Sequence, residues 1–371
     1  MKVLFISADT RSLIQFRRDL MLDLKKRGHE VHAISPNKDQ RGDPKILEND
    51  GIKIHEISFN RTGMNPFKDF TTFLKMAKVI REVRPELVFS FMIKPVIYGS
   101  LAAYLSKVEK IYSLIPGVGH VFLNGSFKGK ILRFVVARMY QCALFFNEKV
   151  FFQNNDDRKL FISHSILNEK KAFKVNGSGV NMDLFCREKK VLERPVFLLA
   201  GRIIAEKGIK EYIEAARKVK KKKGDGVKFL LAGGFDKNPT SYNQKTLNDL
   251  NFDDTVEYLG DQKDMKKLYE EASVYVLPSY REGTPRSTLE AMSMKMPVIT
   301  TDVPGCRETV RENINGHLVS LHSVDELSEK MERFVEDCSL IEKMGQASYK
   351  IVEEKFDVKK VNQTYIREMR L

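Results

Sequence analysis

The chain has 371 residues, of which 42% are hydrophobic and 30% are charged. This composition excludes a disordered or fibrous protein, and the length exceeds the roughly 100 to 200 residues that one domain usually holds. The 63 Lys and Arg outnumber the 49 Asp and Glu, which gives a net charge of +14 and favours anionic partners: nucleotides, phospholipid surfaces or nucleic acid.

Apolar runs of strand length alternate with helix-period segments along the whole chain, which is typical of parallel α/β architecture. The N-terminal apolar run is too short for a signal peptide, so we interpret it as the first strand. We expect seven strands in the first half, at 2–8, 29–35, 52–57, 86–92, 110–115, 149–154 and 172–177. Six more are expected at 195–202, 227–234, 255–261, 273–279, 296–302 and 315–321.

Between the two series of strands, at 181–195, the apolar periodicity lapses and charged residues dominate. We therefore expect two Rossmann-like, doubly wound domains, at 1–185 and 190–356, with a last helix at 357–371 that packs back on the first domain. Open parallel sheets bind ligands outside the carboxyl ends of their strands, so we expect a substrate cleft between the two halves.

The four cysteines are far apart in sequence and have no metal-ligand spacing, which indicates reduced thiols in a cytoplasmic chain. No window approaches the ~18 to 20 uninterrupted apolar residues that a membrane span needs. Any contact with a membrane is therefore expected to be peripheral.

The segment 279–291 carries two carboxylates, Glu282 and Glu290, eight positions apart. Thr284 followed by Pro285 reads as an N-cap residue and a proline at the first helical position, so a helix is expected to begin at Pro285. The free amides and the positive dipole end of that helix suit an anion. We expect both carboxylates to face the mouth of the cleft.

Two cations, Arg202 and Lys207, follow an earlier strand of the same half. Carboxylates accept hydrogen bonds from vicinal hydroxyls, while Arg and Lys can neutralise a departing diphosphate, so the combination suits a nucleotide sugar. The chain contains no Asp-x-Asp pair that would hold a divalent ion. We therefore predict no metal and no other cofactor, the two cations supplying the positive charge.

The segment 196–320 resembles the donor half of retaining glycosyltransferase family 4, which has the GT-B fold. The resemblance is carried by GRIIAEKG at 201–208 and by a Glu-x7-Glu signature at Glu282 and Glu290. It implies that Glu282 holds donor-sugar hydroxyls, that Arg202 and Lys207 bind the diphosphate, and that Glu290 binds the ribose. It also implies that the main chain at Gly283, Thr284 and the neighbours of Pro285 contacts the sugar and the distal phosphate. The main chain at Leu259, Gly260 and Asp261 is implied to contact the base, which is uracil in most relatives.

Segments 89–103, 114–122 and 151–161 are similar to bacterial members of the family that build capsule, O-antigen and lipid-linked glycans, including N-acetylgalactosaminyltransferases that act on bacillosamine-linked undecaprenyl diphosphate. This resemblance implies a UDP-linked N-acetylhexosamine, such as GalNAc or GlcNAc, as donor and an undecaprenyl-diphosphate-linked saccharide as acceptor. Many family members place a catalytic histidine near the position of His120.

Four residues of the first half are candidates for binding the acceptor. Gly117 and Gly119 let the backbone come close to a ligand. Lys94 follows a strand at its carboxyl end and could contact an acceptor phosphate or simply cover a loop. Arg17 is a further candidate for an acceptor phosphate.

The expected helix at 126–146 mixes Lys and Arg with apolar residues, a composition suited to an anionic bilayer surface, although its apolar side could equally be ordinary core. We predict a cytoplasmic enzyme peripherally associated with the inner face of the cell membrane.

The predicted reaction is transfer of a sugar from a UDP-sugar to a lipid-linked saccharide, with retention, in synthesis of bacterial surface polysaccharide or glycoprotein glycan. A UDP-sugar epimerase or hydrolase on the same fold is one alternative. A basic nucleic-acid-binding protein is another, suggested by the net charge and by the lysines at 219–223, but the chain has no recognised nucleic-acid-binding module and we predict no such partner.

Overall fold

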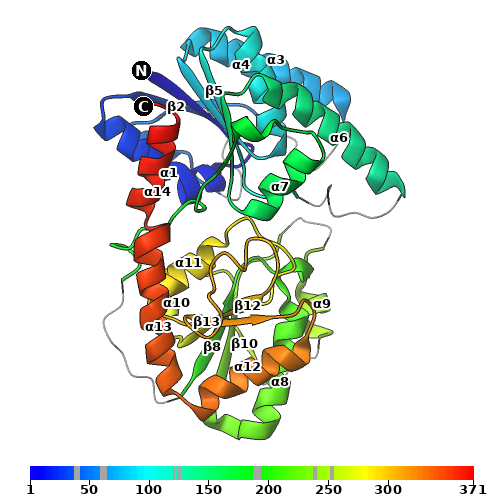
Figure 1. Ribbon diagram of the computed structural model, residues 1–371, viewed down its shortest axis with the longest axis vertical. Coiled ribbons are helices and arrows are strands. Elements are labelled where there is room, and N and C mark those ends of the chain that lie inside the picture. The colour runs from blue at the N-terminus through cyan, green and yellow to red at the C-terminus, as the bar shows by residue number, and fades with distance from the viewer. Residues whose placement is uncertain are drawn as a thin grey trace. The chain divides into compact units, whose positions relative to one another are not determined.

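The computed structural model describes residues 1–36, 42–58, 65–119, 122, 127–186, 194–236, 240–250 and 255–371. The chain divides into two compact units (Figure 1). Unit 1 is Met1–Ser178 with Val361–Leu371, and unit 2 is Gly179–Lys360.

Unit 1 is built on a seven-stranded parallel sheet in the order β3-β2-β1-β4-β5-β6-β7. Its strands are β1 (Lys2–Ile6), β2 (Glu30–Ser35), β3 (Lys53–Glu56), β4 (Leu87–Phe91), β5 (Lys110–Ile115), β6 (Lys149–Phe152) and β7 (Ala172–Lys174). Its helices and helical turns are α1 (Thr10–Lys26), α2 (Lys45–Asn49), α3 (Pro66–Val83), η1 (Pro95–Gly99), α4 (Ser100–Leu105), α6 (Phe127–Phe145), α7 (Asn155–Ser163) and η2 (Glu169–Lys171).

Unit 2 is built on a six-stranded parallel sheet in the order β10-β9-β8-β11-β12-β13. Its strands are β8 (Val196–Ala200), β9 (Lys228–Ala232), β10 (Glu257–Tyr258), β11 (Val274–Leu277), β12 (Val298–Thr301) and β13 (Gly316–Val319). Its helices and helical turns are η3 (Ala205–Lys207), α8 (Ile209–Lys223), η4 (Gly224–Gly226), α9 (Gln244–Asn248), α10 (Met265–Glu270), α11 (Arg286–Ser293), α12 (Val324–Glu336), α13 (Ser339–Ile351) and η5 (Val352–Phe356). The α14 helix (Val358–Glu368) begins in unit 2 and continues into unit 1.

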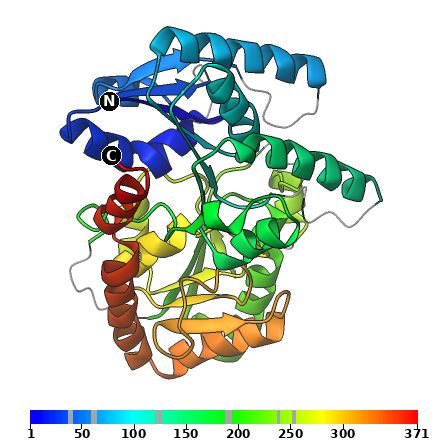
Figure 2. The same ribbon diagram turned by 45° about the horizontal axis from the view of Figure 1, so that its top comes forward.

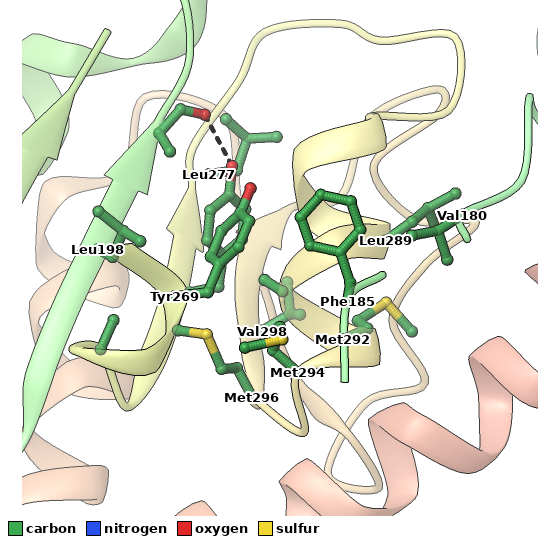
Figure 3. Packing of buried hydrophobic residues seen from close by; sticks show 14 of the residues in the cluster. Val180, Phe185, Leu198, Tyr269, Leu277, Leu289, Met292, Met294, Met296 and Val298 are labelled. Carbon is green, nitrogen blue, oxygen red and sulfur yellow. Dashed lines mark hydrogen bonds between the residues drawn. The ribbon is translucent and has the colours of Figure 1, made fainter. Parts of the chain in front are cut away.

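Each strand expected from the sequence is present, and the reason is burial on both faces. Strands of a parallel sheet are covered by helices on both sides and therefore read as continuous apolar runs. Every residue of β8 and β11 is buried, for example. On one face of the unit 2 sheet, Leu198 and Val298 pack with Leu289, Met292 and other residues of one hydrophobic cluster (Figure 3).

The ends of α3 show how local sequence fixes a helix. The Asn65 side chain accepts hydrogen bonds from the amides of Phe67 and Lys68, and Pro66 occupies the first helical position, where a missing N–H costs nothing. Because α3 precedes β4 in a parallel sheet, this capped end lies at the carboxyl edge of the unit 1 sheet.

The last residues of the chain belong to the core of unit 1, where the red end of α14 lies beside the blue α1 helix (Figures 1 and 2). Tyr365 is fully buried, and its ring contacts Phe89 and Phe151 edge to face. The Asn362 amide donates a hydrogen bond of 2.7 Å to Asp23 of α1. The C-terminal segment is therefore part of the unit 1 fold.

We expect Tyr365→Ala to lower the free energy of unfolding by roughly 3 to 5 kcal/mol, the usual cost of removing a buried aromatic side chain. The change would be measured as a shift in the urea midpoint. Gln363→Ala, at an exposed position of the same helix, is the matched control and should leave the midpoint unchanged. Equal midpoints for both variants would contradict this role of the C-terminal segment.

Candidate active site

The candidate site lies at the carboxyl edge of the unit 2 sheet. All six strands are parallel, so the loops that follow them meet at one edge. The strand order reverses direction between β8 and β11, and ligands of doubly wound sheets bind at such a switch point. The segments that follow these two strands carry Arg202 and Lys207, and Glu282, respectively.

Lys207 and Glu282 form an ion pair at this switch point. The Lys207 Nζ lies 2.5 Å from the Glu282 Oε1, and the hydroxyl of Ser279 donates to the same oxygen at 2.6 Å. The side chains of Lys207 and Glu282 are only 13% and 16% exposed, and the Lys207 stem lies next to Gly201. The structure thus brings together two residues predicted to bind the sugar and the diphosphate.

The loop that carries Glu282 is supported by a second loop, after β12, that the sequence did not predict. The Glu282 amide donates to the carbonyl of Pro304 at 3.0 Å. Gly305 has a φ of +82° and lies against the carbonyl oxygens of Glu282 and Gly283, where any side chain would clash. The glycine after Pro304 is the one sequence signal that could have indicated this contact.

A buried thiol belongs to the same region. Burial raises the pKa of Cys306 to about 12, and the nearby charge of Glu282 adds to the rise. The thiol is therefore protonated at neutral pH and is not a nucleophile.

The helix after this loop begins one residue later than expected. Pro285 has an extended backbone, with φ −71° and ψ 113°, and is the N-cap residue of α11, so the predictions of Thr284 as N-cap and Pro285 as first helical residue were wrong. Pro285 and Thr284 are buried, whereas Gly283 is half-buried. The proposed amide contacts of this segment to the donor stay predictions.

Glu290, in the middle of α11, is held inside unit 2 by two side chains. Its Oε1 accepts from the Arg286 Nε at 2.9 Å, and its Oε2 accepts from the Tyr269 hydroxyl at 3.1 Å. Burial raises the pKa of Glu290, and the Arg286 guanidinium opposes that rise. Contact of Glu290 with a ribose stays a prediction.

Arg202 pairs with a residue that sequence analysis missed. Its Nη1 lies 2.9 Å from the Oδ2 of Asp236, which follows β9. The Arg202 side chain is 47% exposed while that of Asp236 is 3% exposed, so the aspartate fixes a guanidinium that stays open to solvent. No short motif marks Asp236. It follows β9, and it reaches Arg202 only because β9 pairs with β8 in the sheet.

The predicted base-binding segment follows β10. The amide of Gly233 donates to the carbonyl of Gly260 at 2.8 Å, and Gly260 has a φ of +68°. Leu259 is half-buried and Asp261 is exposed. Two loops of the carboxyl edge are thereby joined through main-chain atoms. Contact of Leu259, Gly260 and Asp261 with a base stays a prediction.

The residues predicted to bind the acceptor lie in unit 1. The Lys94 Nζ lies 2.6 Å from the Oδ1 of Asp69, in the first turn of α3. Gly119 has a φ of +70°, which favours glycine, and Gly117 is half-buried in the same loop. His120 lies outside the described residues, so its predicted catalytic role is untested.

Arg17 is buried in the core of unit 1. Its guanidinium lies over the rings of Phe91 and Tyr365, at 5.6 and 5.3 Å from their centroids, and the residue is only 2% exposed. These contacts explain its position by cation–π packing. Its contact with an acceptor phosphate stays a prediction.

In the part of the chain that the structure describes, no three His, Cys, Asp or Glu side chains form a group that could hold a metal ion. In the same residues, no helix is long and apolar enough to cross a bilayer.

Comparisons with known proteins agree with this geometry. The family model "Glycosyl transferase 4-like" matches residues 2–154, and "Glycosyl transferases group 1" matches residues 183–351. The two matches fall on the two sheets, one each. The chain is a glycosyltransferase.

Two similar proteins have named activities. The N,N'-diacetylbacillosaminyl-diphospho-undecaprenol alpha-1,3-N-acetylgalactosaminyltransferase of Campylobacter jejuni is 29% identical over 350 residues, which cover 91% of this glycosyltransferase and 90% of that one. The UDP-Gal:alpha-D-GlcNAc-diphosphoundecaprenol alpha-1,3-galactosyltransferase of Escherichia coli is 26% identical over 73% of this chain and 71% of that one.

The fold is also found among solved structures. The crystal structure of Anabaena HepE in complex with UDP and glucose matches 100% of this chain and 99% of that one, with a TM-score of 0.81 and 16% identity. The glycosyltransferase therefore has the GT-B fold, as expected from the resemblance of its second half.

The pH dependence of stability tests the environment of Glu290. A carboxyl whose pKa is raised in the folded state stabilises the fold below its unfolded pKa, and this contribution is lost as pH rises through the folded value. Relative to Glu290→Gln, the wild type should therefore lose stability as pH rises above the ordinary glutamate pKa of 4.5, at no more than ~1.4 kcal/mol per pH unit.

Urea unfolding of both proteins across this pH range measures the effect. Glu329→Gln is the control, because the Glu329 side chain is 67% exposed. Parallel pH curves for the wild type and Glu290→Gln would contradict the assignment.

Proposed function

We propose that this glycosyltransferase moves a sugar from a UDP-sugar to an undecaprenyl-diphosphate-linked saccharide, with retention of anomeric configuration. The observation that carries the proposal is the Lys207–Glu282 pair at the switch point of a doubly wound sheet. A cation for a diphosphate and a carboxylate for sugar hydroxyls are adjacent where such a fold binds its ligand.

The donor roles follow from charge and position. Glu282 would accept hydrogen bonds from sugar hydroxyls, and Lys207 with Arg202 would bind the diphosphate. Asp236 limits the motion of Arg202, so less conformational entropy is lost when the guanidinium binds a phosphate. The main chain at Leu259–Asp261 would meet the uracil.

The reaction builds positive charge on the sugar and negative charge on the departing diphosphate. Lys207 and Arg202 would stabilise the leaving group, which is the task of a metal ion in other transferases, so we propose that no metal is required. The leaving phosphate would take the proton of the acceptor hydroxyl on the same face of the sugar. This route needs no carboxylate nucleophile, and a trapped glycosyl-enzyme adduct would refute it.

The acceptor and the sugar are proposed from the relatives. The names of the Campylobacter jejuni and Escherichia coli enzymes both specify a diphospho-undecaprenol acceptor and an alpha-1,3 linkage, and one of them specifies a UDP donor. The more similar of the two transfers N-acetylgalactosamine. We therefore propose a UDP-linked N-acetylhexosamine, and synthesis of a bacterial surface glycan.

The deciding experiment offers a panel of labelled UDP-sugars to the enzyme and a bacterial membrane lipid extract in EDTA. We expect label from one donor, an N-acetylhexosamine, in the organic phase. Glu282→Gln should lower this transfer by roughly 2 to 4 kcal/mol of transition-state stabilisation, because a partly buried charged acceptor is lost.

Glu312→Gln, at a carboxylate that pairs with His317 on β13, is the control for loss of a charge in unit 2. Sugar transfer by Glu282→Gln at the wild-type rate would contradict the assignment of Glu282 to donor binding. UDP binding without any transfer in the presence of the extract would favour the epimerase or hydrolase alternative.

The lysine run at 219–223 does not favour nucleic-acid binding. It lies at the C-terminal end of α8, and residues of that helix pair with α12: Lys222 lies 2.8 Å from Glu332 and Lys223 lies 2.8 Å from Glu336. Cations at a helix C-terminus also complement the helix dipole. Two lysines of the run are thus paired within unit 2.

The membrane contact is proposed for unit 1. One face of α6 packs in the core through Val136, Tyr140 and Leu144. The opposite side exposes Ile131 and Phe134, at 53% and 61%, beside Lys130 and Arg138. The sequence of α6 contains no Asp or Glu, so the charge of this face is complementary to an anionic bilayer.

A second helix adds to this surface. Phe67, Phe70 and Leu74 of α3 are exposed, three and four positions apart, so they share one helix face. The exposed lysines Lys68 and Lys75 flank them. Both α3 and α6 precede strands of the parallel sheet, so their N-terminal halves lie at its carboxyl edge, where a lipid-linked acceptor would be bound. We propose that this surface holds the enzyme on the inner, cytoplasmic face of the membrane.

Vesicle sedimentation tests the surface. The enzyme should bind phosphatidylcholine vesicles that contain phosphatidylglycerol, and high salt should weaken that binding. We expect Ile131→Ser to lower the affinity about tenfold, which corresponds to about 1.4 kcal/mol of lost apolar burial. Ile314→Ser in unit 2 is the matched control, because Ile314 is also 53% exposed. Equal losses in both variants would exclude α6 as the docking face.

A further inference from the structure

Three side chains beside the Glu282 loop form a cluster that the proposed reaction does not use. Tyr280 lies in that loop, two residues before Glu282. Glu211 is the third residue of α8, and His322 lies in the turn between β13 and α12. The cluster therefore joins three segments of unit 2.

The carboxylate of Glu211 is the centre of the cluster. Its Oε1 accepts from the Tyr280 hydroxyl at 2.8 Å and lies 2.9 Å from the Nδ1 of His322. The rings of Tyr280 and His322 meet edge to face, with centroids 4.3 Å apart. Burial, together with Glu211, raises the pKa of Tyr280, so its hydroxyl remains a hydrogen-bond donor at neutral pH.

Two features of the cluster are unfavourable for the stability of the fold. Glu211 is 8% exposed, and its Oε2 has no hydrogen-bond partner among the described residues. His322 has a φ of +63°, in the left-handed region that few side chains adopt. Such features persist when the surrounding structure enforces them, and they concentrate near functional sites.

The main chain ties the same loop to the segment that carries Lys207. The amide of Tyr280 donates to the carbonyl of Glu206 at 2.8 Å. Lys207 is the next residue, and Glu211 follows four positions later. Tyr280 is thus fixed to the 206–211 segment through its backbone and through its side chain.

We infer that Glu211, Tyr280 and His322 are positioning residues that set Glu282 against Lys207 for binding of the donor. The inference rests on the proposed role of this ion pair in binding a nucleotide sugar. The three residues act through the loop and touch no reacting atom.

The variant Tyr280→Phe removes one hydroxyl and keeps the ring. We expect faster amide hydrogen exchange in a peptide that spans 279–284, at an unchanged melting temperature. The KM for the nucleotide sugar should rise about tenfold, which corresponds to about 1.4 kcal/mol, while the KM for the lipid-linked acceptor stays constant. A residue with only a structural role would not separate the two KM values.

Conservative replacement sharpens the test. Glu211→Gln retains an oxygen that can accept from Tyr280 and should keep the donor KM near that of the wild type, whereas Glu211→Ala should raise it as Tyr280→Phe does. Glu332→Gln is the matched control, because Glu332 links α12 to α8 through Lys222 at the opposite end of α8. It should change neither the loop exchange nor either KM.

The outcomes separate this inference from the proposed function. Faster loop exchange with an unchanged donor KM in Tyr280→Phe overturns the inference and leaves the proposed function intact. If the wild type transfers no sugar from any UDP donor, the proposed function fails, and amide exchange of the loop alone decides the inference. Unchanged exchange in Tyr280→Phe then overturns the inference. Faster exchange in Tyr280→Phe supports a loop held by Glu211.

Discussion

The ion pair between Lys207 and Glu282 is the interaction on which the candidate site depends. Two charges that are mostly removed from water are costly unless each is paired and hydrogen-bonded. Here Ser279 supplies the additional hydrogen bond, so the carboxylate is satisfied before any ligand arrives. A donor with hydroxyls and a diphosphate would replace each partner with one of the same chemical kind. In the proposed function, the pair would therefore keep both charges satisfied until the donor binds.

Only the topology of the sheet brings the two charges together, since they are 75 positions apart in the sequence. Parallel strands place all following loops at one edge, and the reversal of strand order separates the helices that would otherwise cover it. Gly305 completes the arrangement, because its left-handed backbone lets the loop after β12 lie directly against the main chain of Glu282. The position of the carboxylate is thus fixed by main-chain packing as well as by its own hydrogen bonds.

The strands could be predicted from sequence because burial on both faces makes each of them a continuous apolar run, as in β8 and β11. The gathering of strand-end cations and a strand-end carboxylate at one sheet edge could also be predicted, since parallel strands place their following loops there. The direct ion pair of Lys207 with Glu282 was not predicted. The start of α11 could not, because the extended conformation of Pro285 depends on tertiary contacts. Asp236 and Glu211 were missed for a related reason: each contacts a site segment across the sheet edge, and no local pattern marks such a contact.

The net charge of the chain illustrates the same limit. Composition counts the lysines at 219–223 and the cations of α6 alike, yet the structure separates them. Lys222 and Lys223 of α8 are matched by Glu332 and Glu336 of α12, so these two lysines contribute little field at a distance. The cations of α6 stand beside exposed apolar side chains on a helix without a single acid. An anionic membrane that attracts the enzyme would therefore act on the cations of unit 1. The two groups of cations differ in whether acidic side chains pair with them, and amino-acid composition holds no information about such ion pairs.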